Sequence, residues 1–246
     1  MKFTLATALT AWTLASAIAP ANAADMPIKA PAPPAAIATW TGCYIGGNGG
    51  YGWSKKEYED PLAVPPAILG QHHPQGGVGG GQVGCDYQSG AWLLGAQGMF
   101  DGGRLSGRHV VPGGTDVLGT RIDWLATATA RVGWVLQPNA LFYVKGGGAW
   151  VRDKETIVDL GVPEGRAEFT RSGWTVGFGG EIRWWSNVSV FVEYDYLDFG
   201  RRNATYTNLE VPPVPPTFPL SIRQEVHLFL AGINYRFGVP GVTARY

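Results

Sequence analysis

The sequence has few charged residues, few cysteines and, beyond its first residues, no long apolar run. Charged residues make up 15% of the 246 residues, and 19 basic residues balance 19 acidic ones, so no bulk basicity indicates a nucleic-acid partner. After residue 23 no apolar run approaches the roughly 20 residues of a spanning helix, which excludes a helical membrane protein but not a β-barrel. The two cysteines, Cys43 and Cys85, are compatible with an oxidising periplasm.

Glycine and aromatic side chains, in contrast, are abundant. The chain contains 36 Gly and ten each of Trp, Tyr and Phe. This composition suits neither a helical bundle nor a disordered polymer, and it points to a domain rich in β-sheet.

The first 39 residues have the features of an export signal followed by a leader. Residues 1–23 combine a basic N-terminus, an apolar run and the sequence Ala21-Asn22-Ala23, which predicts a secretory signal peptide cleaved after Ala23. A short N-terminal membrane anchor is the alternative, but the apolar run is shorter than a spanning helix needs. Residues 24–39 are rich in Pro and Ala and are predicted to form an extended periplasmic leader.

Beyond the leader, eight segments alternate apolar and polar residues as β-strands do. Each runs for roughly 11–15 residues, long enough to cross a bilayer at a tilt. The connections alternate between long and short, which is typical of an antiparallel up-and-down meander. The predicted strands are 40–54, 76–88, 91–101, 120–135, 141–151, 172–184, 188–199 and 223–237, and the predicted long loops are 55–75, 102–119, 152–171 and 200–222.

The two faces of these segments distinguish a membrane barrel from a soluble sheet. In segment 120–135, Ile122, Trp124 and Trp134 share one face with three alanines. Such apolar faces carry aromatic residues near their ends, as a lipid-facing girdle does. The polar faces are crowded with glycine, which suits a narrow interior where side chains interdigitate. The sequence therefore predicts an all-β fold, an eight-stranded antiparallel up-and-down transmembrane β-barrel over residues 40–237.

Ten charged residues point inward in this register, and their signs balance. Because a buried charge is costly unless it is paired, the balance predicts an ion-pair network in a lumen too narrow for a wide channel. The alternative is that several of them lie in water at the barrel rims and pair with nothing. The acids are Asp86, Asp123, Glu181, Glu193 and Asp195, and the bases are Arg121, Arg131, Lys145, Arg183 and Arg236.

Seven stretches of the sequence, taken in order, resemble the strands of a known family. They are WTGCYIGGNGGYGWS (40–54), GGGQVGCDY (79–87), RIDWLATATARVGW (121–134), YVKGGGAW (143–150), GWTVGFGGEIRW (173–184), FVEYDYLDFG (191–200) and AGINYRFG (231–238). The family is that of the small outer-membrane β-barrel surface antigens of Gram-negative bacteria, often described as porin-family or outer-membrane immunogenic proteins. The resemblance implies an OmpA-like barrel in the outer membrane, with no cofactor and no catalytic residues.

The sequence also departs from the pattern of this family. Cys43 and Cys85 stand where the family usually has aromatic girdle residues, and the chain continues for nine residues after Phe237, where members commonly stop. Thr129 stands in place of an inward arginine and Phe191 in place of an inward lysine. The lumen network is therefore expected to be smaller than in the family.

The two cysteines fall close to each other in the predicted register. If the first hairpin is centred near residue 65, Cys43 lies opposite residues 85–87. Directly opposed strand residues have Cα atoms about 4.5–5.5 Å apart, a distance that a disulfide can span. We therefore predict a disulfide between Cys43 and Cys85 on the outward face, with two free thiols as the alternative.

The last strand, 223–237, is predicted to pair with the first, because a lipid-exposed sheet edge would leave backbone groups unsatisfied. Its outward face ends in Tyr235 and Phe237, which resemble the terminal signal read by the barrel assembly machinery. Gly238 and Pro240 interrupt the strand, so residues 238–246 are predicted to form a short periplasmic tail. The alternative is that the terminal Tyr246 supplies the signal.

The four histidines raise the question of a metal site or a catalytic site. His72, His73 and His109 fall in predicted loops without the spacing of a zinc site, so they are expected to be solvated. His227 falls on the outward face near Ser221, but a hydrolase triad also needs an orienting acid and an oxyanion site. We expect no metal, no cofactor and no enzymatic activity.

These observations favour a monomeric integral outer-membrane protein that contributes to envelope integrity and displays long loops as an antigen or adhesion surface, without turnover. The expected partners are outer-membrane lipids, the barrel assembly machinery and an unidentified surface partner of the loops, but no nucleic acid. One alternative is a small diffusion channel. A soluble lipocalin-like barrel is a further alternative, but it would need its apolar residues inside.

Overall fold

The computed structural model describes residues 39–60, 62, 64, 67–110, 116–209 and 217–237, and the strands over these residues form one antiparallel sheet. The signal peptide, its cleavage site at Ala23, almost all of the leader and the tail 238–246 lie outside the described residues. Within the described residues there is no helix long and apolar enough to span a membrane. The strands are β1 (Gly42–Asp60), β2 (Ala67–His72), β3 (Gln75–Ser89), β4 (Trp92–Val110), β5 (Asp116–Gln137), β6 (Ala140–Asp159), β7 (Val162–Arg183), β8 (Val188–Asn208) and β9 (Thr217–Arg236).

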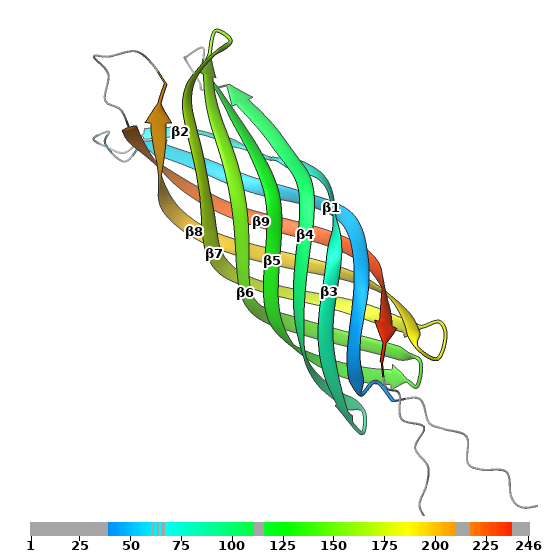
Figure 1. Ribbon diagram of the computed structural model, residues 1–246. Coiled ribbons are helices and arrows are strands. Elements are labelled where there is room, and N and C mark those ends of the chain that lie inside the picture. The colour runs from blue at the N-terminus through cyan, green and yellow to red at the C-terminus, as the bar shows by residue number, and fades with distance from the viewer. Residues whose placement is uncertain are drawn as a thin grey trace, which may run out of the picture. The chain divides into compact units, whose positions relative to one another are not determined.

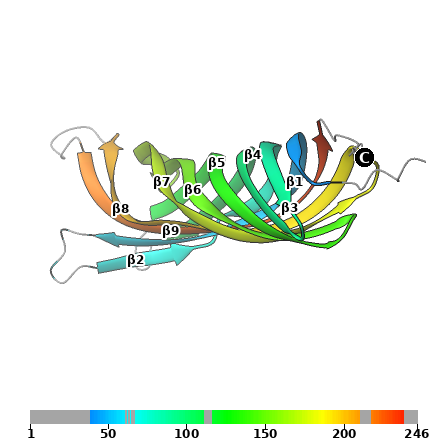
Figure 2. The same ribbon diagram turned by 90° about the horizontal axis from the view of Figure 1, so that it is seen from below.

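The sheet closes on itself through its first and last strands. β9 pairs with β1 from Tyr44↔Arg236 to Glu59↔Ser221, and the two strands lie side by side in Figure 1. β2 pairs with the outer part of β1, as Figure 2 shows. After an interruption at Pro74, β3 continues along β1 in the same register. A proline has no backbone N–H for the ladder. β2 and β3 together are therefore the second strand of a barrel, and the predicted eight-stranded up-and-down fold is confirmed.

The strands are longer than the sequence predicted. β5 and β7 each have 22 residues, and the predicted loops 55–75, 102–119, 152–171 and 200–222 were wrong over much of their length. β6 continues to Asp159 and β8 continues to Asn208, whereas residues 210–216 of the last predicted loop lie outside the described part. The barrel wall therefore extends well beyond the segments that alternate apolar and polar residues.

The outer surface carries two rows of aromatic side chains. On the side of the short turns, Trp92 packs edge-on against Trp134 with ring centroids 4.5 Å apart. Toward the other end of the strands, the rings of Phe100 and Trp124 lie 5.7 Å apart, and Trp150 is also exposed on this side. Trp124 and Trp134 belong to different rows and lie ten residues apart on β5. At the usual strand tilt, ten residues cover a height of about 25 Å, which is the height of the apolar band of an outer-membrane barrel. The strands beyond the second row form an extracellular extension.

The lumen consists of alternating polar and apolar layers, which the inward side chains of β6 display in order. Leu141 and Tyr143 lie at the periplasmic end, and Lys145 follows. Ala149 and Val151 belong to an apolar cluster in the middle. A second charged layer and a second apolar cluster lie beyond it. We call the middle cluster the apolar layer; its members are Val78, Met99, Leu105, Ile122, Leu125, Ala149, Val151, Leu197, Phe199, Val226, Leu228 and Leu230.

The structure links Cys43 and Cys85 by a disulfide between β1 and β3. The two residues are directly paired, and their Cα atoms lie 3.9 Å apart. Both side chains are on the outward face near the periplasmic end.

We expect reduction of this disulfide to lower the free energy of unfolding by about 2–4 kcal/mol, because the bridge restricts the unfolded chain over 42 residues of separation. Urea unfolding in detergent with and without reductant measures the difference, and a Cys43→Ser/Cys85→Ser variant is the control that should not respond to reductant. Two thiols titrated in protein extracted under alkylating, non-reducing conditions would contradict the bridge.

Candidate functional site in the barrel lumen

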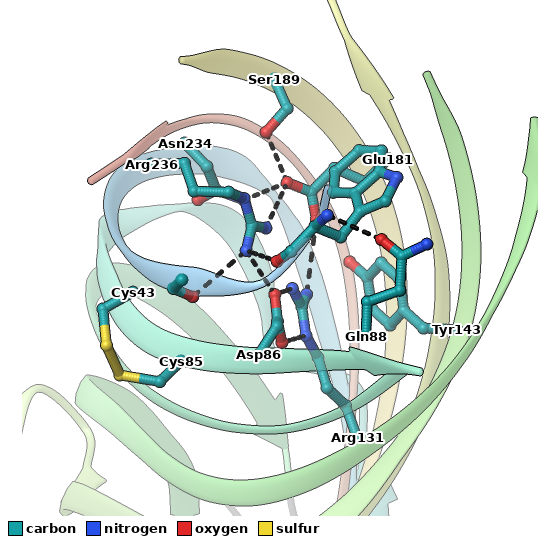
Figure 3. A network of polar contacts seen from close by, with 12 residues as sticks. Cys43, Cys85, Asp86, Gln88, Arg131, Tyr143, Glu181, Ser189, Asn234 and Arg236 are labelled. Atoms are coloured by element: carbon teal, nitrogen blue, oxygen red, sulfur yellow. Dashed lines mark hydrogen bonds and ion pairs between the residues drawn. A yellow bond between two sulfur atoms is a disulfide. The ribbon is translucent and has the colours of Figure 1, made fainter. Parts of the chain in front are cut away.

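Four charged side chains meet at the periplasmic end of the lumen and form what we call the inner network: Asp86, Arg131, Glu181 and Arg236 (Figure 3). Arg131 donates from Nε to Asp86 Oδ1 at 2.7 Å and makes a second bond from Nη2 to the other carboxylate oxygen. Arg236 donates from Nη1 to Asp86 Oδ2 at 2.7 Å. Both arginines lie 3.4 Å from Glu181. Two acids and two bases are thus paired with no net charge in the cluster.

Neutral groups complete the inner network. Glu181 accepts hydrogen bonds from Ser189 Oγ at 2.5 Å and from Asn234 Nδ2 at 3.1 Å. The guanidinium of Arg131 lies 4.8 Å from the centroid of the Tyr44 ring. Because a buried ion pair is stable only when its remaining donors and acceptors are satisfied, these contacts make the charged cluster tolerable inside the barrel.

Trp40 closes the periplasmic mouth below this network. Its side chain is fully buried, and the Arg236 guanidinium donates to its backbone carbonyl at 2.8 Å. Its ring lies between Arg236 and Arg183, with guanidinium carbons 5.2 Å and 4.6 Å from the ring centroid. Trp40 precedes β1, which begins at Gly42, so its side chain lies in the lumen mouth and not in the barrel wall.

A second charged group lies one step further into the lumen. Lys145 Nζ lies 2.6 Å from Glu193 Oε1 and 3.0 Å from Asp195 Oδ2. Tyr143 donates from its hydroxyl to Glu193 at 2.8 Å. The structure therefore brings eight of the ten predicted lumen charges to the inner face, seven of them in ion pairs and Arg183 half-buried over Trp40.

Arg121 and Asp123 are the two exceptions, and their predicted inward positions were wrong. A β-bulge between Ile122 and Trp124 inserts an extra residue into β5. Ile122 and Leu125 are both buried, so inward side chains stand at even positions before the bulge and at odd positions after it. Arg121 consequently points outward with 55% of its side chain exposed, and pairs with Asp123 at 3.1 Å.

Several large polar side chains of the lumen lie opposite a glycine. Tyr44 pairs with Gly84, and a Cβ added to Gly84 would lie 2.4 Å from the Tyr44 hydroxyl oxygen. Asp195 pairs with Gly177, where an added Cβ would overlap with the carboxylate. The glycines predicted to line a narrow interior therefore make room for the charged side chains.

An outer network, which the sequence did not reveal, occupies the extracellular extension. Lys56 Nζ donates to Asp153 Oδ1 and to Glu155 Oε1, both at 2.8 Å, and all three side chains are buried. Tyr206 donates to Glu155. Tyr58 and Thr120 share a hydrogen bond of 2.9 Å beside them. Lys56 lies in the predicted loop 55–75, and Asp153 and Glu155 lie in the predicted loop 152–171. Because no strand was predicted there, the sequence did not assign these side chains to an inward face.

The histidine prediction was also wrong for His72. Its ring is buried against Tyr58, with centroids 5.2 Å apart, and its Nε2 lies 3.0 Å from Thr120 Oγ1. The ring of His109 stacks on it with centroids 6.4 Å apart. Burial, together with the positive charge of Lys56, lowers the pKa of His72 from its ordinary 6.5 to about 4. His227, in contrast, lies on the outward face as predicted and contacts the Tyr194 hydroxyl at 2.7 Å.

The low pKa of His72 has a consequence for stability. The unfolded chain binds a proton at this residue below pH 6.5, whereas the folded chain does so only near pH 4, so stability falls as the pH decreases through this window. Glu155 opposes this shift, whereas Lys56, His73 and His109 reinforce it. We expect a loss of about 2–3 kcal/mol at pH 4, measured by urea unfolding at pH 7 and pH 4.

A His72→Gln variant should show a shallower pH dependence than the parent protein. The adjacent His73 is exposed, so His73→Gln is the matched control and should keep the parental dependence. Equal slopes for His72→Gln and His73→Gln would show that burial of His72 does not couple to folding.

Among the described residues, no group of three or more His, Cys, Asp or Glu side chains is placed to hold a metal ion. The inner and outer networks form ion pairs between apolar clusters, whereas the buried Arg171 donates to the backbone carbonyl of Ile222 at 2.9 Å. The geometry is that of a membrane-embedded barrel whose interior is packed with its own side chains.

This fold and this lumen define an integral outer-membrane β-barrel. The chain belongs to the family described as outer membrane protein beta-barrel domain, because the model of that family matches residues 26–237. The predicted family and the predicted location in the outer membrane are both confirmed. The 31 kDa outer-membrane immunogenic protein of Brucella melitensis is 30% identical over 235 residues, which cover 88% of this chain and 93% of that protein. The 25 kDa outer-membrane immunogenic protein of the same organism is 25% identical over 212 residues, 86% of this chain and 85% of that protein. Among solved structures, the outer membrane protein OprG from Pseudomonas aeruginosa has a TM-score of 0.45 at 11% identity, covering 80% of this chain and 96% of that chain.

Proposed function

We propose that this protein is a closed structural barrel, which stiffens the outer membrane and presents its extracellular extension at the cell surface, without conducting solutes and without turnover. The observation that carries this proposal is the apolar layer, whose side chains come from six strands, β3–β6, β8 and β9, and are each at most 7% exposed. A diffusion channel requires a continuous wetted path. Here charged networks lie on both sides of a layer built mainly of apolar side chains, and the buried Asp101, which pairs with Leu125, is a polar side chain at the same level.

Conductance in planar lipid bilayers tests the closed lumen. We expect no discrete current steps from purified, folded protein, in a bilayer where a general porin added as a positive control gives steps. Folding is checked on the same preparation by the change in gel mobility on boiling, which a closed β-barrel shows. Reproducible current steps of one size would overturn the proposal and support the diffusion channel instead.

The absence of turnover is part of the proposal, because the family is mostly non-enzymatic and the buried glutamates of the lumen are engaged in structural ion pairs. Glu181, Glu193 and Glu155 each lie within 3.4 Å of a base and are at most 2% exposed. A general acid or base must reach a substrate within hydrogen-bond distance, directly or through one water. These carboxylates have no surface from which to do so.

The end of the last strand bears on assembly in the membrane. Phe237 packs edge-on against Tyr235 with centroids 5.1 Å apart, both rings face outward, and its backbone N–H donates to Cys43 O at 2.8 Å. We expect Phe237→Ala to lower the amount of assembled barrel several-fold, and deletion of residues 238–246 to have no effect. Outer-membrane fractions analysed by gel mobility with and without boiling give the measurement.

Phe229→Ala is the matched control, because Phe229 lies on β9, faces outward like Phe237 and is 54% exposed, against 51% for Phe237. It loses the same lipid contact but is not at the strand end. If the truncation abolished insertion and Phe237→Ala did not, the signal would lie at Tyr246.

A further inference from the structure

A basic hollow of about 840 Å³ lies on the outer surface of the extracellular extension, over β4 to β7. Four basic side chains line it: Arg108, Arg121, Lys154 and Arg166. The acidic residue of the lining, Glu155, directs its carboxylate into the lumen, where it accepts from Lys56. The outward charge of the hollow is therefore positive.

The shape of the hollow follows from the register of the four strands. Arg108 pairs with Gly119 on β5, and Thr156 of β6 pairs with Arg166 on β7. Gly119, which has no side chain, pairs with Thr156 and forms the floor between the two arginines. With neighbouring strands about 4.8 Å apart, the Cα atoms of Arg108 and Arg166 are separated by about 14 Å.

The hollow lies directly above the extracellular aromatic row. Arg121 pairs with Lys154. The next pair that follows Ile122↔Asp153 toward the membrane is Trp124↔Arg152, and Trp150 lies two residues beyond Arg152 on β6. At about 3.4 Å per residue, the cationic groups start about 10–14 Å along the strands from the Trp124 and Trp150 rings. Because aromatic girdles mark the edge of the hydrocarbon, this position is the headgroup layer of the outer leaflet.

The ion pairs around the hollow leave cations in excess. Asp123 is shared by Arg121 at 3.1 Å and Lys154 at 2.8 Å, and Glu168 is shared by Arg152 at 3.4 Å and Arg166 at 2.7 Å. No acidic side chain in the described part of the chain forms an ion pair with Arg108. On the opposite side of the barrel, two acids share one base, since Arg201 forms ion pairs with both Glu57 and Glu59.

We propose that this hollow binds the phosphate groups of glycolipid headgroups in the outer leaflet of the outer membrane. Arginine binds phosphate through two parallel N–H groups, and the hollow offers three arginines and one lysine facing the headgroup layer. This assignment goes beyond the closed structural barrel, because it depends on the outer surface and not on the lumen.

The test measures binding of purified lipid A to the full-length folded protein in a zwitterionic detergent, by native mass spectrometry. We expect phosphorylated lipid A to bind at least tenfold more tightly than enzymatically dephosphorylated lipid A. The Arg108→Gln/Arg121→Gln variant should bind the phosphorylated form roughly ten- to thirtyfold more weakly, at the usual contribution of one basic residue to an anionic lipid surface.

Arg223→Gln is the matched control. The Arg223 side chain is 51% exposed and lies 3.1 Å from Glu225, and the Arg121 side chain is 55% exposed and lies 3.1 Å from Asp123. Arg223, however, is on β9, away from the hollow. It should bind lipid A like the parent protein, and the boiling-dependent gel mobility of all variants checks that they are folded.

Three results would overturn the proposal. The first is equal binding of phosphorylated and dephosphorylated lipid A, and the second is unchanged binding by the Arg108→Gln/Arg121→Gln variant. The third is displacement of the lipid by millimolar inorganic phosphate or by a soluble sulfated polysaccharide, which would indicate a site for free anions or for an extracellular polyanion. None of these results depends on whether the barrel conducts, so failure here is separate from failure of the closed lumen.

Discussion

Arg131→Met is expected to lower the free energy of unfolding by about 3–5 kcal/mol, the usual cost of removing one partner from a buried ion pair. Arg131 makes both of its short bonds to Asp86 and is 1% exposed. Without it, Asp86 and Glu181 share only Arg236, and one negative charge of the inner network is left without compensation. Urea unfolding of the refolded protein in lipid vesicles, followed by tryptophan fluorescence, gives the measurement.

The double variant Asp86→Asn/Arg131→Met separates charge balance from packing. It leaves one acid, Glu181, and one base, Arg236, 3.4 Å apart, so it should be more stable than the sum of the two single effects predicts, by about 2 kcal/mol. Thr127→Val is the control on the same strand: its buried hydroxyl has no hydrogen-bond partner in the described part of the chain, and its loss should change stability by less than about 1 kcal/mol. Additive single effects would show that Asp86 and Arg131 do not act as a pair.

The membrane-embedded part of the barrel could be predicted from the sequence because its two sides face different surroundings. Lipid outside and a polar lumen inside require alternation with period two, so Arg131, Glu181 and Arg236 could be assigned to the lumen before the strands were seen. Beyond the aromatic row the outside is water. Lys154 faces outward there and Glu155 faces inward, and since both faces are charged, no alternation marks the strand.

Two local features broke the pattern inside the predicted region. The β-bulge at Ile122 shifts the phase of β5, and nothing in the residue types of that strand signals the extra residue. Trp40 has the apolar character of a strand residue, yet it precedes β1 and fills the lumen mouth under Arg236. Its position depends on contacts with residues almost 200 positions away in the chain, which local periodicity does not record.

Gly147→Val is expected to reduce the yield of folded barrel strongly and to lower the free energy of unfolding by about 3 kcal/mol, the upper part of the range for an overfilled interior. Gly147 faces the lumen on β6 and pairs with Thr129 on β5. A Cβ there would lie 2.1 Å from the carbonyl oxygen of Ala128 and 2.8 Å from Thr129 Cα. Both atoms are backbone, so the clash can be relieved only by moving the two strands apart and lengthening their hydrogen bonds.

Gly146→Val is the matched control, because Gly146 is the preceding residue on the same strand and faces the lipid. Its added Cβ would meet only the carbonyl oxygen of Thr175, at 3.5 Å, which is an ordinary contact. Valine is favoured in strands and is compatible with a lipid-facing position, so Gly146→Val should fold as well as the parent protein or better. Refolding yield by gel mobility and urea unfolding compare the two variants. If Gly147→Val and Gly146→Val behaved alike, the close approach of β5 and β6 at this point would not limit what the lumen can contain.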